Sequence, residues 1–170
     1  MLPQIIFGYL AVSIIIMSLL VVTRKNAVHS VLWMLLLFFH IAALYLFLNA
    51  EFLAAIQIII YAGAMLVLYL FVIMLLNLRH ELKAPRFISF WPLGFLVSIA
   101  LLLVLGLSVK AIVHGPLGIY TNDMIKEVGH TGLVGKVLYT EYLFPFEVVS
   151  IILLVAIVGA IVLAKKRLRQ

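Results

Sequence analysis

Residues 52–78 read FLAAIQIIIYAGAMLVLYLFVIMLLNL, a run of 27 residues without one charged side chain. A helix needs about 20 apolar residues to cross a hydrocarbon core roughly 30 Å thick, and this run exceeds that length. Inside a bilayer only helices and closed barrels satisfy their backbone groups, and the run lacks the apolar–polar alternation of a barrel strand. The run therefore predicts a transmembrane helix that is long enough to tilt, kink or contain a wider turn.

The composition of the whole chain agrees with this prediction. Of the 170 residues, 67% are hydrophobic and only 11% are charged, and the mean hydropathy is +1.33. A soluble fold of this size has too little polar surface to cover so much apolar side chain, and disordered chains are poor in such residues. The chain has no cysteine, which excludes disulfides, thiolate-bound metals and a cysteine nucleophile within it.

Five apolar stretches are long enough to span a membrane. They predict an all-α fold with one membrane domain over residues 1–170 and helices at about 2–22, 27–48, 52–78, 88–113 and 144–164. The sizeable loop between the last two helices covers about residues 114–142. Its glycines and its proline predict turns, with one short helix near residues 123–128.

The basic residues gather on one side of this five-span arrangement. Nine of the twelve fall there, namely Arg24, Lys25, Arg79, Lys83, Arg86, Lys165, Lys166, Arg167 and Arg169. The other three are Lys110, Lys126 and Lys136. Because cytoplasmic loops carry the excess of Lys and Arg, we expect the N-terminus outside and the C-terminus in the cytoplasm. The net charge of +6 then reflects topology and contact with membrane lipid, and no nucleic-acid motif accompanies it.

The third predicted helix holds the most informative polar residues. Tyr61, Ala62, Gly63 and Ala64 lie near its middle, and Gln57, Tyr61 and Tyr69 share one face of a regular helix. One interpretation is close helix packing, with Gln and Tyr forming interhelical hydrogen bonds. The other is a deformable turn that moves polar groups in and out of a hydrated path.

Two acidic residues and one histidine are further candidates. Glu51 and Glu147 lie near the outer ends of the third and fifth helices, where an intramembrane acid is a functional candidate. They could instead occupy favoured first-turn positions, with Asn49 capping the third helix and Pro145 starting the fifth. His40, inside the second helix, could relay protons or be a buried histidine with one hydrogen-bond partner. The sequence contains no nucleotide-binding loop, metal-ligand cluster or nucleophile–base pair.

Three segments resemble a known family. Residues 50–78, AEFLAAIQIIIYAGAMLVLYLFVIMLLNL, are similar to subunit J of the proton-pumping NADH:quinone oxidoreductase, respiratory complex I, and to its mitochondrial counterpart, NADH dehydrogenase subunit 6. Residues 26–30, Asn-Ala-Val-His-Ser, resemble the family's Asn-Pro-Val-His-Ser start of the second helix, and residues 135–165 resemble its bacterial fifth helix. Ala27 replaces a frequent proline, and His40 stands where the family has a small or apolar residue.

The resemblance implies a non-catalytic subunit of this oxidoreductase. NADH, FMN, the iron–sulfur clusters and quinone are then bound by other subunits, and this chain binds no cofactor and no metal. The expected partners are the quinone-site subunit and the neighbouring small and antiporter-like subunits, in a bacterial inner membrane. Two alternatives stay open, a subunit of a multi-subunit cation/proton antiporter and a purely structural scaffold.

The resemblance also carries an expectation for the third helix. In this family the middle of that helix can contain a π-bulge, which maps onto Tyr61, Ala62, Gly63 and Ala64. Conversion between the bulged and the regular helix is associated with hydrating or drying the proton path beside the quinone site. We therefore expect this segment to couple quinone reduction to proton translocation.

Overall fold

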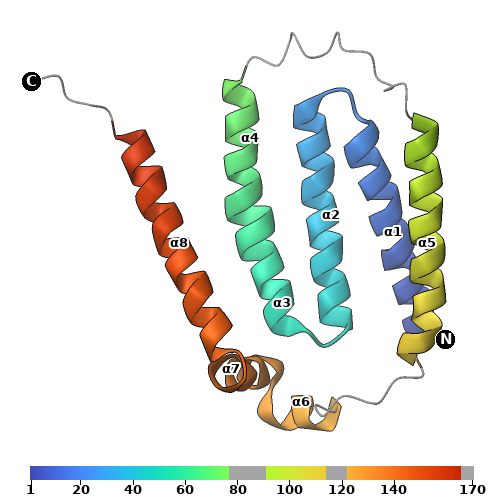
Figure 1. Ribbon diagram of the computed structural model, residues 1–170. Helices are drawn as coiled ribbons and strands as arrows, with labels where there is room; N and C mark the ends of the chain where they lie inside the picture. The colour runs from blue at the N-terminus through green and yellow to red at the C-terminus, as the bar shows by residue number, and fades with distance from the viewer. Residues whose placement is uncertain (77–90, 114–121, 166–170) are drawn as a thin grey trace, which may run out of the picture. The chain divides into compact units, whose positions relative to one another are not determined.

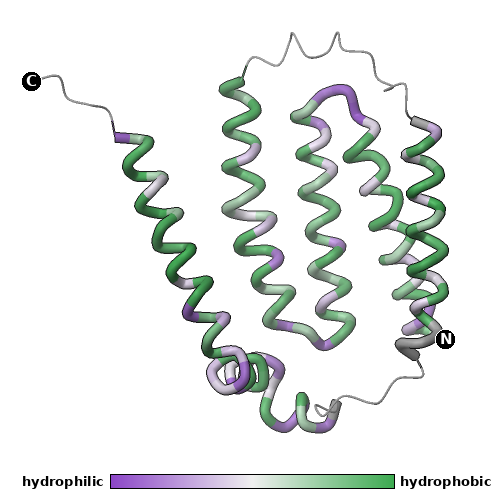
Figure 2. The backbone as a smooth tube through the Cα atoms, viewed as in Figure 1, coloured by the Kyte–Doolittle hydropathy of each residue, from purple (hydrophilic) through white to green (hydrophobic). Residues whose placement is uncertain are grey.

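The structure is a computed structural model that describes residues 1–76, 91–113 and 122–165 (Figure 1). Within these ranges it is helical and contains no strand, which confirms the all-α prediction. Five helical stretches are long and apolar enough to cross a membrane. Figure 2 shows hydrophobic residues along these stretches and hydrophilic residues gathered at the turns.

The first three spans are α1 (Leu2–Thr23), α2 (Ala27–Phe47) and a composite of α3 (Glu51–Ile56), η1 (Gln57–Met65) and α4 (Leu66–Leu75). The remaining elements are α5 (Trp91–Val113), α6 (Asn122–Val128), α7 (His130–Thr140) and α8 (Leu143–Ala164). The third span ends at Leu75 because Leu76 is extended, with ψ 124°. Residues 77–78 and 88–90 of the predicted helices lie outside the described ranges.

Two compact units make up the chain, Met1–Tyr120 and Thr121–Gln170. In the first unit α2 packs against α1 and also against α3, η1 and α4. Small or β-branched residues form the closest contacts, with Val31, Ala42 and Ala54 each 2% exposed or less. Because lipid is as apolar as leucine, the hydrophobic effect does not drive membrane helices together. They associate through close packing, and small side chains let their backbones approach.

The turn between α1 and α2 is fixed by polar side chains. The Asn26 side chain accepts a hydrogen bond from the Val28 N–H at 2.9 Å and so caps α2. The Ser30 hydroxyl donates to the Val21 carbonyl and joins the two helices. The Arg24 guanidinium carbon lies 5.6 Å from the centroid of the Trp33 ring, within cation–π range.

Asn49 ends α2 and does not cap the third helix. Its φ of 58° is left-handed, and the Ala50 N–H donates to the Tyr45 carbonyl at 2.8 Å, the six-residue bond of a Schellman motif. The N-terminus of α3 at Ala50 has no side-chain cap. The expected Asn49 cap is therefore wrong, because the same residue is needed to close the preceding helix. Glu51 does lie in the first turn of α3, as expected.

Asn49→Val is expected to destabilise this turn by about 1–2 kcal/mol, because a β-branched residue is strained at positive φ. Asn49→Gly, which adopts this conformation freely, should leave the stability unchanged or slightly raised. The measurement is the temperature at which the detergent-solubilised complex loses this chain. Equal temperatures for the two variants would show that the left-handed turn is not required.

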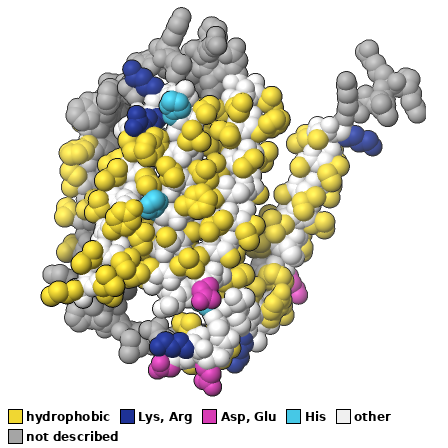
Figure 3. Space-filling view, turned by 180° about the vertical axis from the view of Figure 1, so that it is seen from behind, with side chains coloured by type: hydrophobic (Ala, Val, Ile, Leu, Met, Phe, Trp, Pro, Cys, Tyr) yellow, Lys and Arg dark blue, Asp and Glu magenta, His cyan; other side chains and the backbone are white. Residues whose placement is uncertain are grey.

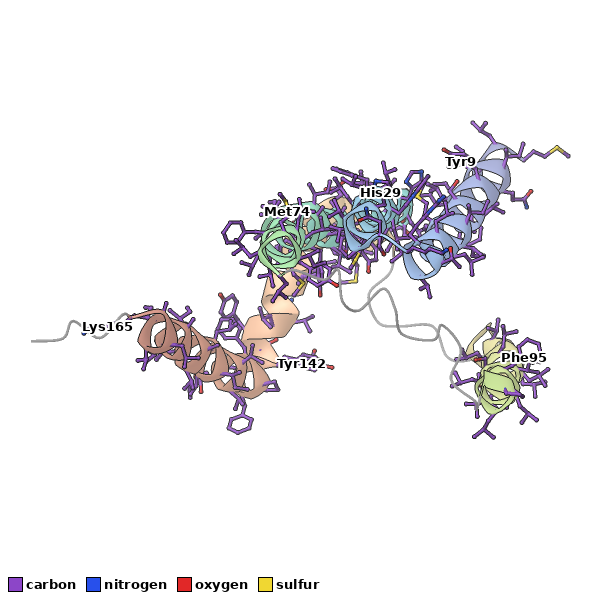
Figure 4. The ribbon with its side chains drawn as sticks, turned by 90° about the horizontal axis from the view of Figure 1, so that it is seen from above. Tyr9, His29, Met74, Phe95, Tyr142 and Lys165 are labelled. Carbon is purple, nitrogen blue, oxygen red and sulfur yellow. The ribbon has the colours of Figure 1, made fainter. Side chains whose placement is uncertain are left out.

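The second unit contains α6, α7 and α8. The sequence predicts α6 but misses α7, because Gly132 and Gly135 inside α7 read as turn residues. The Tyr139 and Phe146 rings meet edge to face at 5.3 Å and join α7 to α8. Side chains stand out on every side of α8, and none of its residues is buried, as Figure 4 shows. Such a helix is suited to contact with lipid or other membrane helices.

Candidate functional site

The middle of the third span is a π-helix. It covers the nine residues Gln57–Met65, and the N–H of Leu66 is shared between the carbonyls of Gly63 and Tyr61, three and five residues earlier. The flanking residues Ile56 and Leu66 have ordinary right-handed helical dihedral angles, so the span continues without a break. Tyr61, Ala62, Gly63 and Ala64 all lie within this segment. π-Helices are rare and frequently mark functional sites.

The π-helix changes which residues of the third span face α2. Its most buried residues are Ala54, Gln57, Ala62 and Leu66, which are 2%, 8%, 5% and 5% exposed. A regular helix returns to the same face after three or four residues, but the step from Gln57 to Ala62 is five. Tyr61 and Met65 would follow Gln57 on the inner face of a regular helix, and they are instead 42% and 57% exposed.

Tyr61 is held by its ring and not by its hydroxyl. The ring lies edge-on to Phe38 of α2, with centroids 5.9 Å apart and an interplanar angle of 71°. Such edge-to-face pairs are favourable beyond their buried area. The hydroxyl makes no hydrogen bond to any residue in the described ranges. The ring therefore contacts α2 while the side chain stays 42% exposed, and the hydroxyl is unpaired among the described residues.

Gly63 allows the widened turn to close. A Cβ atom at this position would lie 3.3 Å from the carbonyl oxygen of Ile58, five residues earlier. This distance is tighter than most Cβ contacts, so a larger side chain would push against the backbone of the π-turn. A side chain at position 63 would therefore require the Ile58 carbonyl to move by a few tenths of an ångström.

The other polar candidates of this span lie in different environments. Gln57 is buried, and its amide makes no hydrogen bond within the part of the chain that the structure describes. Tyr69 in α4 is half-exposed. The Gln57 amide atoms are not among the fully buried polar atoms without a partner, of which His130 Nδ1 is the one found among the described residues.

The His40 side chain of α2 lies against α1. Its Nδ1 atom is 2.9 Å from the Leu36 carbonyl oxygen, one turn earlier in the same helix. Its ring centroid is 6.3 Å from that of Tyr9 in α1. The ring contact of Tyr61 is with Phe38 instead, so the structure gives His40 and Tyr61 different aromatic partners.

The two acidic candidates occupy different helical positions. Glu51 is exposed in the first turn of α3, where the helix dipole favours a negative charge. α8 begins at Leu143, so Pro145 is its third residue and Glu147 its fifth, beyond the first turn. The expectation that Pro145 starts this helix is wrong, because α8 begins two residues earlier. No group of three or more possible metal ligands occurs among the described residues.

Known proteins are similar in sequence to this chain over most of its length. Residues 17–163 match the family model of NADH-ubiquinone/plastoquinone oxidoreductase chain 6. The NADH-quinone oxidoreductase subunit J of Rickettsia felis is 40% identical over 172 residues, which cover 95% of this chain and 80% of that protein. The subunit J of Rhodobacter capsulatus is 36% identical, with 92% and 79% covered.

A chloroplast relative extends the comparison beyond bacteria. The NAD(P)H-quinone oxidoreductase subunit 6 of Physcomitrium patens is 38% identical over 176 residues, which cover 97% of this chain and 85% of that protein. The likeness therefore includes all five spans. The chain belongs to the NADH-ubiquinone/plastoquinone oxidoreductase chain 6 family.

Proposed function

We propose that this chain is a membrane-arm subunit of a proton-translocating NADH:quinone oxidoreductase in a bacterial inner membrane. The names of its relatives and its five apolar helices support this assignment. Its neighbours are the quinone-site subunit and the small and antiporter-like subunits. NADH, FMN, the iron–sulfur clusters and quinone are bound by other subunits, and this chain performs no redox chemistry. Its N-terminus lies outside and its C-terminus in the cytoplasm.

The third span is the coupling element of this proposal. The observation that carries it is the five-residue step from Gln57 to Ala62 in the buried face of the span. A π-helix and a regular helix of the same sequence differ by one residue in which side chains face α2. The conversion therefore replaces Ala62 by Tyr61 on the inner face and Leu66 by Met65 one turn later, so α4 turns about its axis relative to α2.

The two helical registers differ in the polarity of the exposed surface of the third span. In the π-helical state the Tyr61 hydroxyl is exposed and can order water beside carboxylates of adjacent chains. In the regular helix Tyr61 takes the inner position, so its hydroxyl leaves the exposed surface, and apolar side chains close the path. Quinone chemistry in a neighbouring subunit selects between the states, and a bias of a few kcal/mol is sufficient for such a switch.

Tyr61→Phe tests the role of the hydroxyl. It keeps the ring contact with Phe38 but removes the group that orders water, so the coupled proton step should slow by about three- to twenty-fold, the range of a single intramembrane hydrogen bond. The measurement is the number of protons translocated per quinone reduced, in proteoliposomes that contain the purified complex.

Tyr139→Phe is the matched control for this experiment. Tyr139 has a similar edge-to-face contact, 5.3 Å from Phe146, but lies outside the five spans. We expect the control to pump normally. Normal pumping by Tyr61→Phe as well would contradict a coupling role for the hydroxyl and would favour a purely structural role for this chain.

A further inference from the structure

α2 carries a polar acceptor inside the hydrocarbon region. His40 is seven residues from the end of the helix at Phe47, which is about 10 Å along the axis. A carbonyl oxygen can only accept a hydrogen bond, so the Nδ1 atom of His40 must donate to the Leu36 carbonyl at 2.9 Å. In a neutral imidazole the other ring nitrogen, Nε2, is then an acceptor.

Tyr9 adds a second polar group at the same depth. It is seven residues from the start of α1 at Leu2, again about 10 Å along the axis. Its ring centroid lies 6.3 Å from that of His40, and its side chain is 64% exposed. Figure 4 shows Tyr9 on α1 of the first unit. Neither the Tyr9 hydroxyl nor His40 Nε2 has a hydrogen-bond partner among the described residues.

Apolar side chains surround this pair. Leu36 is one turn before His40 and Val12 is three residues after Tyr9, and they are 45% and 56% exposed. In Figure 3, hydrophobic side chains cover the surface between the helix ends, whereas the Lys, Arg, Asp and Glu side chains lie near the ends. We name the surface formed by Tyr9, Val12, Leu36 and His40 the Tyr9–His40 face.

Acyl chains offer no hydrogen bond to this face. An unpaired imidazole nitrogen and a phenol in hydrocarbon are costly, and polar residues within membrane helices are normally paired with other helices. The depth of about 10 Å also places both groups below the headgroups. The occupant must therefore reach the middle of the membrane and supply an O–H or N–H donor.

We infer that the Tyr9–His40 face docks a transmembrane helix of another subunit, whose Ser, Thr, Asn or Gln side chain donates a hydrogen bond to His40 Nε2. The inference rests on the proposed assembly into a multi-subunit complex and is independent of the coupling role of the third span.

His40→Leu distinguishes a partner helix from lipid, because the two predict opposite changes in how firmly neighbouring subunits are retained. Against a partner, leucine removes the acceptor and leaves the donor unpaired, so the neighbouring subunit should dissociate about three- to twenty-fold more readily. Against lipid, leucine is better solvated than histidine and retention is equal or higher. The measurement is the fraction of neighbouring membrane subunits that a tag on this chain retains as the detergent concentration rises.

Two further variants complete the test. His40→Gln keeps an acceptor and should restore most of the retention, and Phe39→Leu, an exposed apolar change at the same depth, should retain the subunit normally. Benzoylphenylalanine in place of Leu36 should form a covalent adduct with another membrane subunit on illumination. Adducts with lipid or with α5 of the same chain alone, or unchanged retention by His40→Leu, would overturn the inference. Loss of pumping with intact retention would instead concern the coupling proposal.

Discussion

Gly63→Val in the assembled oxidoreductase is expected to lower proton translocation strongly while the complex still forms. The valine Cβ would lie 3.3 Å from the Ile58 carbonyl oxygen of the π-turn, and its two methyl groups add further crowding. Overpacking of this kind costs about 1–3 kcal/mol, which corresponds to a shift of about 5- to 150-fold between two states. The π-helical state should become the minor one, and proton translocation should be uncoupled from quinone reduction or slowed together with it.

Gly106→Val is the matched control for this change. Gly106 lies in the α5 span, and a Cβ atom there would meet nothing within 4 Å. The two variants introduce the same side chain into a membrane helix, but only one crowds a π-turn. Both should be measured for assembly, for NADH-driven quinone reduction and for protons translocated per quinone. Normal coupled pumping by an assembled Gly63→Val complex would contradict the proposed switch.

Ala62→Leu is expected to favour the regular helix by a different route. Ala62 is 5% exposed and belongs to the face that packs on α2, so a leucine there overfills the interface by about 1–3 kcal/mol. In the regular helix the inner positions are Tyr61 and Met65, and position 62 turns away from α2. The variant should therefore reduce coupled pumping as Gly63→Val does, although it leaves the backbone contact with Ile58 untouched.

Ala55→Leu is the control within the same span. Ala55 is exposed in α3, outside the π-helix, and added carbon atoms there do not enter the interface with α2. It should assemble and pump as the unchanged chain does. If Ala62→Leu pumps normally too, the buried position of Ala62 is not needed for coupling, and the two-register account of the third span fails.

The five-span architecture follows closely from the sequence. Uninterrupted apolar runs such as residues 52–78 leave only helices possible in hydrocarbon, and the structure has helices in each of the five predicted stretches. The segment Tyr61–Ala64 could also be singled out from the sequence. Three small residues beside a tyrosine, in a span longer than the membrane, predict either close packing or a wider turn.

The register of the third span could not be predicted in the same way. The bonding of Leu66 to Tyr61, five residues away, competes with ordinary four-residue bonding that uses the same donors and acceptors, so composition does not distinguish them. The outward position of Tyr61 depends on packing against α2 and on the Phe38 ring. Likewise, Asn49 suits either helix end beside it, and only the φ of 58° shows which end it serves.

The most direct test of the two-register account is the backbone hydrogen-bond pattern of residues 58–68 in the intact complex, determined at rest and during turnover. The account predicts five-residue bonds with the Tyr61 hydroxyl exposed in one condition, and four-residue bonds with the Tyr61 hydroxyl buried in the other. The same pattern in both conditions, with Tyr61 in one position while protons are pumped, would contradict it.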